Sequence, residues 1–199
     1  MAPAPSVTVA ILAGGAGARF GGRDKGLVEL AGKPLVEWAL RGIPSDADSL
    51  IVANRNLDIY AGFARVVSDA LPGHRGPLLG ILAALRAART DFVATLPVDC
   101  PRPPRDWLAR LIAPLQAHTS LKLCVAHDGQ RREPLFAVYR RNAIDSSTDE
   151  SVSDAPVWRW QDELGARDVD FSDVADAFAN INNEAERLAY EQRIAHEFS

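Results

Sequence analysis

The strongest chemical signal in the sequence is a glycine-rich segment near its start, Leu12-Ala-Gly-Gly-Ala-Gly-Ala-Arg-Phe-Gly-Gly-Arg-Asp-Lys-Gly26. Glycines allow backbone N–H groups to approach a ligand that a Cβ atom would exclude. Arg19, Arg23 and Lys25 add three positive charges to the same segment. Because backbone amides and cations together bind phosphate groups, the segment predicts a polyphosphate site rather than a simple flexible turn.

Two familiar nucleotide-binding patterns do not fit this segment. After Gly15-x-Gly17, the dinucleotide fingerprint requires a glycine at the position of Phe20. A P-loop requires GK followed by Ser or Thr at a fixed distance from an earlier glycine, and the sequence has no such run. These departures disfavour a nicotinamide-dependent oxidoreductase, and they leave the identity of the phosphate ligand open.

Carboxylate and amide side chains follow several apolar runs that are typical of strands. Asp99 lies in Leu96-Pro-Val-Asp-Cys-Pro101, directly after the apolar run 92–96, and there it could hold Mg²⁺ against phosphate oxygens. An isolated Asp before proline is more often a turn former, but this one shares the expected sheet edge with the glycine-rich segment. We expect Asn54 and Asp69 at the same edge.

Near the end of the chain, Phe178-Ala-Asn-Ile-Asn-Asn183 places Asn180 and Asn182 on one side of an extended segment. Taken alone, these asparagines are typical of turns or helix caps. Asn183 and Glu186 resemble a capping box that opens a helix ending at Phe198.

The elements that must position these residues alternate along the chain. Apolar runs predict strands over 7–13, 49–53, 92–96, 121–126 and 135–139, and helical patterns cover 35–41, 107–116 and a stretch beginning at Pro77. This rhythm predicts an α/β fold with a mostly parallel sheet covered on both faces, which binds ligands at the carboxyl ends of its strands. Residues 145–156, rich in Ser and Asp, predict a solvated loop.

Composition excludes several other classes. The chain has 199 residues, of which 47% are hydrophobic, and its net charge of −4 disfavours duplex DNA or an anionic membrane as the main partner. Its two cysteines and four histidines lack CxxC and HExxH spacing, which disfavours a structural zinc site. Residues 1–18 imitate a signal peptide, but no Lys or Arg precedes the apolar run, so we expect a cytoplasmic protein.

The ordered segments LAGGxGxRFGGxDKGL, ANR, the Asp69 segment, GPLxGIL, LPVDCP, HDGxRxxP and FxNIN closely resemble the molybdenum cofactor guanylyltransferases over about residues 7–190. LAGGxGxR alone is shared with many nucleotidyltransferases, whereas DKGL with HDGxRxxP and FxNIN is much more specific. The resemblance implies a single three-layer α/β/α domain over residues 1–199, with a Rossmann-like nucleotidyltransferase fold. Within it, a GTP-binding part spans about 7–105 and a molybdopterin-side part about 120–190.

The same resemblance implies the reaction and the residues that serve it. GMP would pass from MgGTP to the terminal phosphate of molybdopterin, with release of pyrophosphate. Lys25, Asp99 and Arg19 would be catalytic, and Asp99 would also bind the metal. The GTP-binding positions would be Leu12, Ala13, Gly14, Gly15, Lys25, Asn54, Asp69 and Asp99. The molybdopterin-binding positions would be His127, Asp128, Gly129, Arg131, Asn180 and Asn182.

One departure concerns the pterin phosphate. Many relatives carry a basic pair before the penultimate helix, whereas this chain has Ser153-Asp-Ala-Pro156, with Arg159 as the nearest cation. Alternatives to the implied function are transfer of CMP to molybdopterin, transfer of a nucleotide to a sugar phosphate, and a non-catalytic molybdopterin carrier. Molybdopterin-insertion and molybdoenzyme-maturation proteins are the expected protein partners.

Overall fold

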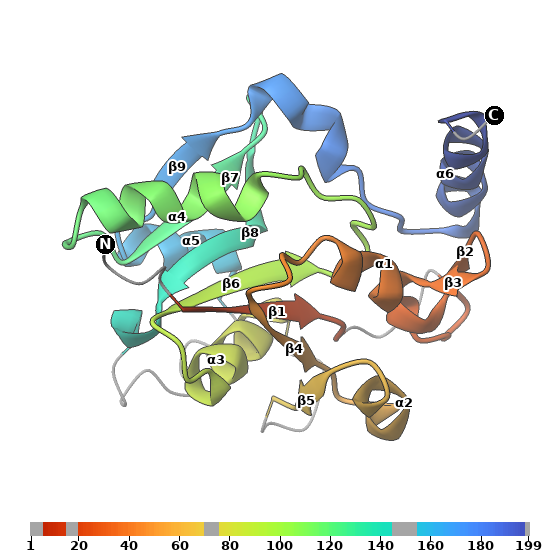
Figure 1. Cartoon of the computed structure of the whole chain (residues 1–199), viewed down its shortest axis with the longest axis horizontal. Helices are drawn as coiled ribbons and strands as arrows, with labels where there is room; N and C mark the ends of the chain where they lie inside the picture. The colour runs from red at the N-terminus through yellow and green to blue at the C-terminus, as the bar shows by residue number, and fades with distance from the viewer. Residues whose placement is uncertain (1–5, 15–19, 70–75, 145–154, 198–199) are drawn as a thin grey trace.

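A seven-stranded sheet forms the centre of the computed structural model, which describes residues 6–14, 20–69, 76–144 and 155–197. The strands of this sheet are β1 (Val7–Leu12), β4 (Asp48–Val52), β5 (Arg65–Val67), β6 (Phe92–Pro97), β7 (Leu123–His127), β8 (Arg132–Arg140) and β9 (Arg167–Asp170). They lie in the order β5-β4-β1-β6-β8-β7-β9 (Figure 1). The expected single sheet therefore continues from the predicted GTP-binding part into the predicted molybdopterin-side part, and that functional division stays a prediction.

The sheet is mostly parallel, as the sequence predicts. β1 pairs in parallel with β4 and β6, β4 with β5, and β7 with β9. Only β8 runs against its neighbours, β6 and β7. Because β8 follows β7 through a short turn, that turn lies at the same edge as the carboxyl ends of the parallel strands.

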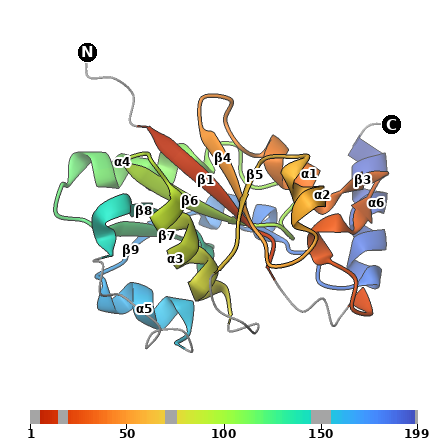
Figure 2. The same cartoon turned by 90° about the horizontal axis from the view of Figure 1, so that it is seen from below.

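Helices cover both faces of the sheet, which gives the three layers that the resemblance implies (Figures 1 and 2). The helices are α1 (Leu35–Arg41), α2 (Leu57–Ala61), α3 (Pro77–Ala87), α4 (Trp107–Ala117), α5 (Val157–Glu163) and α6 (Glu184–Glu197). Side chains of β1 alternate between two apolar clusters. Val9 and Ile11 pack with α1 and α4, whereas Ala10 and Leu12 pack with α3 and α5. A strand buried on both faces in this way explains the continuous apolar run that the sequence shows.

A third apolar cluster attaches the last helix to the segment after the glycine-rich loop. It contains Phe20, Val28, Leu30, Leu35, Ile181 and Ile194. Val28 and Leu30 lie in and beside a hairpin formed by β2 (Glu29–Leu30) and β3 (Lys33–Pro34), and Figure 2 shows α6 beside β3. Phe20, which replaces the fingerprint glycine, is therefore a packing residue that is 4% exposed. This cluster brings Ile181 back to the segment that follows the glycine-rich loop.

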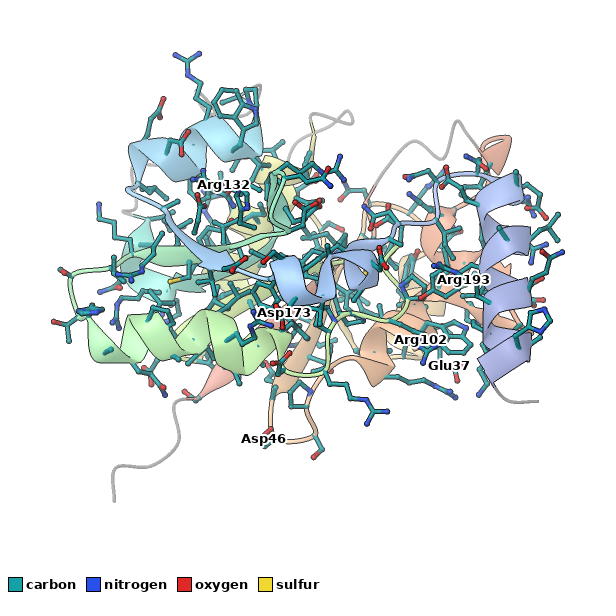
Figure 3. All side chains as sticks on the ribbon, turned by 90° about the horizontal axis from the view of Figure 1, so that it is seen from above. Glu37, Asp46, Arg102, Arg132, Asp173 and Arg193 are labelled. Carbon is teal, nitrogen blue, oxygen red and sulfur yellow. The ribbon has the colours of Figure 1, made fainter. Side chains whose placement is uncertain are left out.

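Charged pairs join the elements around β8 and β9, at the end of the sheet opposite β5. Arg132, at the start of β8, donates to Asp168 of β9 and to Asp162 of α5, each at 2.6 Å (Figure 3). The α4 residue Arg110 donates to Asp173 at 2.9 Å in the short helix η5 (Ser172–Phe178). These contacts fix the elements that lead into residues 180–182.

Some observed helix and strand boundaries differ from those that the sequence predicts. The strand predicted over 92–96 extends one residue further, because Pro97 is the last residue of β6 and pairs with Leu12. Strands β5 and β9 and helix α2 carry only three, four and five residues, too short for a clear periodic signal. Most of the expected loop at 145–156 lies outside the described residues. Within the described part of the chain, no helix has both the length and the apolar character required to cross a membrane.

Candidate active site

Four parallel strands deliver the first group of predicted residues to one edge. Gly14 follows β1, Asn54 follows β4, Asp69 follows β5 and Asp99 follows β6, and these strands are neighbours in the sheet. Backbone hydrogen bonds continue beyond the strand ends. Ala13 N–H donates to the carbonyl of Val52 at 2.9 Å, Ala53 N–H to that of Val67 at 3.0 Å, and Val98 N–H to that of Leu12 at 3.3 Å. The site residues thus extend from a fixed backbone frame.

Asn54 and Asp69 are adjacent at this edge. The side-chain oxygen of Asn54 accepts a hydrogen bond from the Asp69 N–H at 3.2 Å. The Oδ1 atom of Asp69 is buried and has no hydrogen-bond partner. A buried acceptor without a partner is costly, so this atom is suited to accept a hydrogen bond from a ligand N–H or O–H group.

Lys25 connects the two halves of the predicted site. It begins the short helix η2 (Lys25–Leu27), and its Nζ forms an ion pair with Oδ2 of Asp99 and donates to Oδ1 of Asn182 at 2.9 Å. The Ile181 N–H donates to the backbone carbonyl of Asp99 at 2.9 Å. Asn182, which the resemblance assigns to the molybdopterin side, thus also contacts a predicted phosphate-binding lysine, and its role toward molybdopterin stays a prediction.

Buried oxygens without partners lie along the same edge of the sheet. Among the described residues, four buried side-chain atoms lack a hydrogen-bond partner, and three of them are Oδ1 atoms of Asp69, Asp99 and Asn180. The fourth belongs to Gln161, on α5. Buried polar atoms in folded proteins normally have partners, so this concentration indicates a place built to receive a ligand.

The turn between β7 and β8 contains the predicted residues His127, Asp128, Gly129 and Arg131. Asp128 accepts from the backbone N–H groups of Gln130 and Arg131, each at 2.7 Å, and these bonds hold its pKa below the ordinary value of 3.8. Gly129 has a φ of 97°, and a Cβ there would lie 2.7 Å from the Cβ of Ser172. Asp128 and Gly129 thus shape the turn itself.

The remaining side chains of this turn also have internal partners. Nδ1 of His127 accepts from the Gly129 N–H at 3.1 Å, and Arg131 donates to Glu133 at 2.8 Å. Within the described ranges, no hydrogen bond joins this turn to Lys25 or Asp99. The turn shares the sheet edge with those residues.

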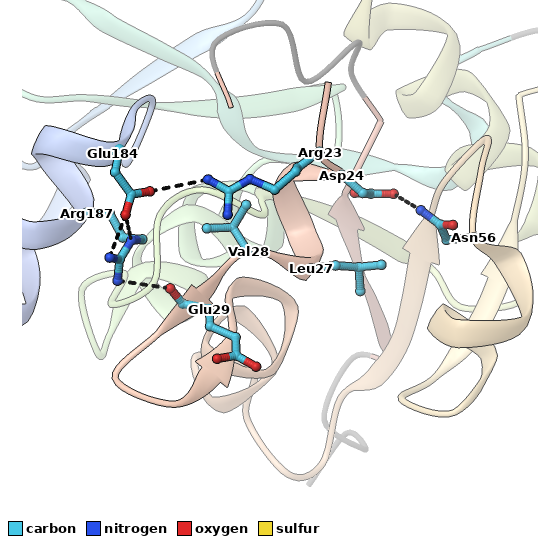
Figure 4. A pocket seen from close by; sticks show the side chains of 8 residues that line it. All are labelled: Arg23, Asp24, Leu27, Val28, Glu29, Asn56, Glu184 and Arg187. Carbon is cyan, nitrogen blue, oxygen red and sulfur yellow. Dashed lines mark hydrogen bonds and ion pairs between the residues drawn. The ribbon is translucent and has the colours of Figure 1, made fainter. Parts of the chain in front are cut away.

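The glycine-rich segment is only partly described. Gly15 and Arg19 lie outside the described residues, whereas Gly14 is exposed and a Cβ on it would meet no atom within 4 Å. Arg23 is directed toward α6, where it lies 3.4 Å from Glu184 and lines a pocket of about 560 Å³ (Figure 4). Arg23 therefore pairs with α6, and among the described cations of this segment it is Lys25 that joins Asp99.

Cys100 follows Asp99 but is no candidate nucleophile. Its thiol is buried and donates to the carbonyl of Ala177 at 3.2 Å. Burial, together with the nearby charge of Asp99, raises the pKa of the Cys100 thiol well above its usual range. Since the thiolate is the reactive form, the sulfur is inert here.

Sequence reasoning missed a buried group next to Lys25. Asp24 accepts a hydrogen bond from the Tyr60 hydroxyl at 2.6 Å and from the Asn56 amide at 2.9 Å. The available signal was the order Asp24-Lys25-Gly26 within the glycine-rich segment. Its partners lie in the short helix α2 and at the residue directly before it, and α2 is too short for a periodic pattern to predict it.

Known proteins provide an independent comparison. A family model described as "MobA-like NTP transferase domain" matches residues 9–167. The chain is similar to a protein from Archaeoglobus fulgidus named molybdopterin-guanine dinucleotide biosynthesis protein A, with a TM-score of 0.78, 23% identity, and 95% and 99% of the two chains covered. The family match places the chain in the class of nucleotidyltransferases, and the structural likeness agrees with that fold.

Sequence relatives narrow the class. Proteins named molybdenum cofactor guanylyltransferase from Vibrio atlanticus and Mannheimia succiniciproducens are each 39% identical to this chain. The alignments cover 88% of this chain and 91% of the first relative, and 91% of this chain and 96% of the second. The chain belongs to the molybdenum cofactor guanylyltransferase family, which confirms the resemblance inferred from the motifs.

Proposed function

We propose that this protein transfers GMP from GTP to the terminal phosphate of molybdopterin and releases pyrophosphate. The observation that carries the proposal is the group formed by Lys25, Asp99 and Asn182, which joins the glycine-rich side of the sheet edge to the C-terminal segment. Family membership supports the choice of nucleotide and acceptor.

The proposed reaction is a displacement at phosphorus. An oxygen of the molybdopterin phosphate forms a bond to the α-phosphorus of GTP, and the bond from that phosphorus to the oxygen bridging to the β-phosphate breaks. Pyrophosphate leaves with the electron pair. The nucleophile is already ionised near pH 7, so no general base is required, and catalysis depends on alignment and on neutralising the leaving group.

Different residues bind the nucleotide, its phosphates and the acceptor in the proposed reaction. Backbone groups of Leu12, Ala13 and Gly14, with Asn54 and Asp69, hold the nucleotide at the ends of β1, β4 and β5. The ammonium group of Lys25 has three donors, and after Asp99 and Asn182 one remains for a phosphate oxygen. Asn180 and Asn182, with the 127–131 turn, face the acceptor. Gly15 and Arg19 keep their proposed phosphate-binding and catalytic roles.

Asp99 is the residue that we propose to hold Mg²⁺. One of its oxygens is paired with Lys25, and the other is buried without a partner, so an anionic oxygen ligand of the type that Mg²⁺ prefers is present. Among the described residues, no group of three or more His, Cys, Asp or Glu side chains forms a dedicated cage. The remaining ligands would therefore be phosphate oxygens and water, and the bound ion would neutralise charge on the departing pyrophosphate.

A panel of nucleotides tests the proposal. The purified chain is incubated with Mg²⁺, molybdopterin and each of GTP, CTP, ATP and UTP, and both pyrophosphate and the dinucleotide product are measured. We expect product with GTP. Product with CTP would instead support a cytidylyltransferase. Product formed when a sugar phosphate replaces molybdopterin would indicate a different class of acceptor. Molybdopterin binding without GTP consumption would indicate a carrier.

A CTP arm is needed because the fold alone does not choose the nucleotide. A solved synthetase named CMP:2-keto-3-deoxy-manno-octonic acid synthetase, complexed with CTP, reaches a TM-score of 0.69 at 12% identity. A cytoplasmic location, and delivery of the product to insertion and maturation proteins, stay predictions that follow from the proposed reaction.

A further inference from the structure

Asp24, the residue before Lys25, is a buried carboxylate with an unusual number of partners. Its side chain is 5% exposed. It accepts hydrogen bonds from the Tyr60 hydroxyl at 2.6 Å, the Asn56 amide at 2.9 Å and the Gly26 N–H at 3.2 Å (Figure 4 shows the Asn56 contact). A buried carboxylate is costly unless it is hydrogen-bonded, so the surrounding structure is organised around this group.

The partners of Asp24 come from two separate elements. Asp24 is the N-cap of η2, because its side chain accepts from Gly26, one residue beyond Lys25. Asn56 occupies the corresponding position before α2, with a left-handed φ of 54°. The Asn56 side chain does not cap its own helix but donates to Asp24. One carboxylate therefore fixes the start of both helices.

Close packing reinforces this arrangement. A Cβ on Gly26 would lie 2.3 Å from the Tyr60 hydroxyl oxygen, so only glycine allows the two elements to approach this closely. Burial, followed by the hydrogen bond to Asp24, raises the pKa of Tyr60 well above its usual range, which keeps its hydroxyl a donor.

Arg55 adds a further restraint. It lies 3.7 Å from Asp24 and also donates to the backbone carbonyls of Gly22 and Arg23, each at 3.3 Å. The backbone that leads into η2 is therefore held from the α2 side, in the stretch immediately before Lys25.

We propose that Asp24 is the positioning residue for Lys25. By tying η2 to α2, it keeps the Lys25 ammonium group between Asp99 and Asn182, where it meets the phosphates of the nucleotide. Asp24 acts through Lys25 and does not touch substrate, since its oxygens are buried and engaged. This inference rests on the proposed function, because the role of Lys25 is part of it.

A double-mutant cycle separates positioning from general structural support. Asp24→Asn should lower kcat with GTP about tenfold or more, because the anionic acceptor that fixes η2 is lost. Lys25→Met should lower kcat at least as much. In the Lys25→Met background, Asp24→Asn should cause no further loss, because residues that act as one unit are not additive. Asp58→Asn removes the same charge from an exposed position on α2 and should behave like the wild type.

The wild type and these four variants, with their thermal unfolding recorded, give decisive outcomes. Losses that multiply in the double variant would overturn the proposal, as would an Asp24→Asn enzyme that matches Asp58→Asn. If Asp24→Asn does not fold, Tyr60→Phe removes a single donor to the carboxylate and should show a smaller loss that also vanishes in the Lys25→Met background. Calorimetric titration with GTP repeats the cycle without any transfer step. A wild-type chain that binds GTP but forms no dinucleotide contradicts the proposed function and leaves this test standing.

Discussion

Lys25 Nζ donates a hydrogen bond of 2.9 Å to Oδ1 of Asn182, although 157 positions separate the two residues in the chain. The same nitrogen pairs with Asp99 at the end of β6. A residue expected on the nucleotide side and a residue expected on the acceptor side are therefore in direct contact. The two halves of the site share one ammonium group.

This contact leads to different expectations for the two asparagines. Asn182→Ala removes a partner that orients Lys25, so GTP affinity should fall about two- to tenfold, the effect of one hydrogen bond. Asn180→Ala removes an oxygen that has no hydrogen-bond partner among the described residues, so GTP affinity should stay unchanged while transfer to the acceptor falls. Calorimetry with MgGTP beside a transfer assay measures both. Equal GTP affinities in the two variants would contradict the coupling.

Replacing Asp99 tests the metal assignment. Asp99→Asn keeps the shape of the side chain but removes its charge, so Mg²⁺-dependent turnover should fall by about 10²–10³ or more. The fold should persist, because the backbone bond from Ile181 to the carbonyl of residue 99 does not involve the side chain. Turnover is followed over a Mg²⁺ titration, with circular dichroism as the control. Near-normal turnover would remove Asp99 from the mechanism.

Replacing Lys25 tests its contact with phosphate. A cation that binds the triphosphate and also stabilises the leaving group should contribute to both affinity and rate. Lys25→Ala should therefore raise KM for GTP and lower kcat together. Steady-state kinetics over a range of GTP concentrations give both values. A variant with unchanged kinetics and normal thermal stability would place this lysine outside the reaction.

Two glycines of the same segment should respond in opposite ways to alanine. At Gly26 the added Cβ would lie 2.3 Å from the Tyr60 oxygen, so Gly26→Ala should destabilise the fold by about 1–3 kcal/mol. At Gly14 the space is open, so Gly14→Ala should leave the thermal midpoint unchanged but reduce GTP affinity, because the methyl group would occupy ligand space. Thermal unfolding and calorimetry on both variants check the contrast. A destabilised Gly14→Ala protein with normal GTP affinity would be inconsistent with it.

The 127–131 turn should weaken in acid. Backbone N–H groups of Arg131 and Gln130 lower the pKa of Asp128 below 3.8. A carboxylate whose pKa is lower in the folded state stabilises that state above its unfolded pKa, and the contribution is lost as the pH falls through the folded value. The protection of the Gln130 and Arg131 amides against exchange, measured relative to their intrinsic rates at each pH, should therefore fall below about pH 4. The acid dependence should be absent in Asp128→Asn.

The sequence predicts this fold well where residues are buried on both sides. The continuous apolar runs of β1 and β6 predict central strands, and those strands place Asp99 beside the glycine-rich segment. β9, with the sequence RDVD, is exposed at the edge of the sheet and is largely polar, so it gives no strand pattern. A run of apolar residues therefore identifies the strands that are buried on both faces, and it does not identify a polar strand at the edge of the sheet.

The site shows a similar division. Lys25 and Asp99 are recognisable together, because the glycine-rich segment and the buried strand before Asp99 are expected at the same edge of the sheet. The contact between Lys25 and Asn182 depends on Ile181, which packs with Phe20 and Ile194 in the third apolar cluster. The proximity of Lys25 and Asn182 is set by tertiary packing, and it leaves no local pattern in the sequence. The partners of Asp24 were missed for the same reason, since Asn56 and Tyr60 face it from a different element.

The contact of residues 180–182 with Lys25 and Asp99 has a consequence for biosynthesis. A ribosome produces a chain from its N-terminus, so every described strand of the sheet is made before Asn182. Lys25 and Asp99 therefore exist in the nascent chain before the side chain of Asn182 does. A chain truncated before residue 180 would carry all of these strands without the amide that accepts from Lys25.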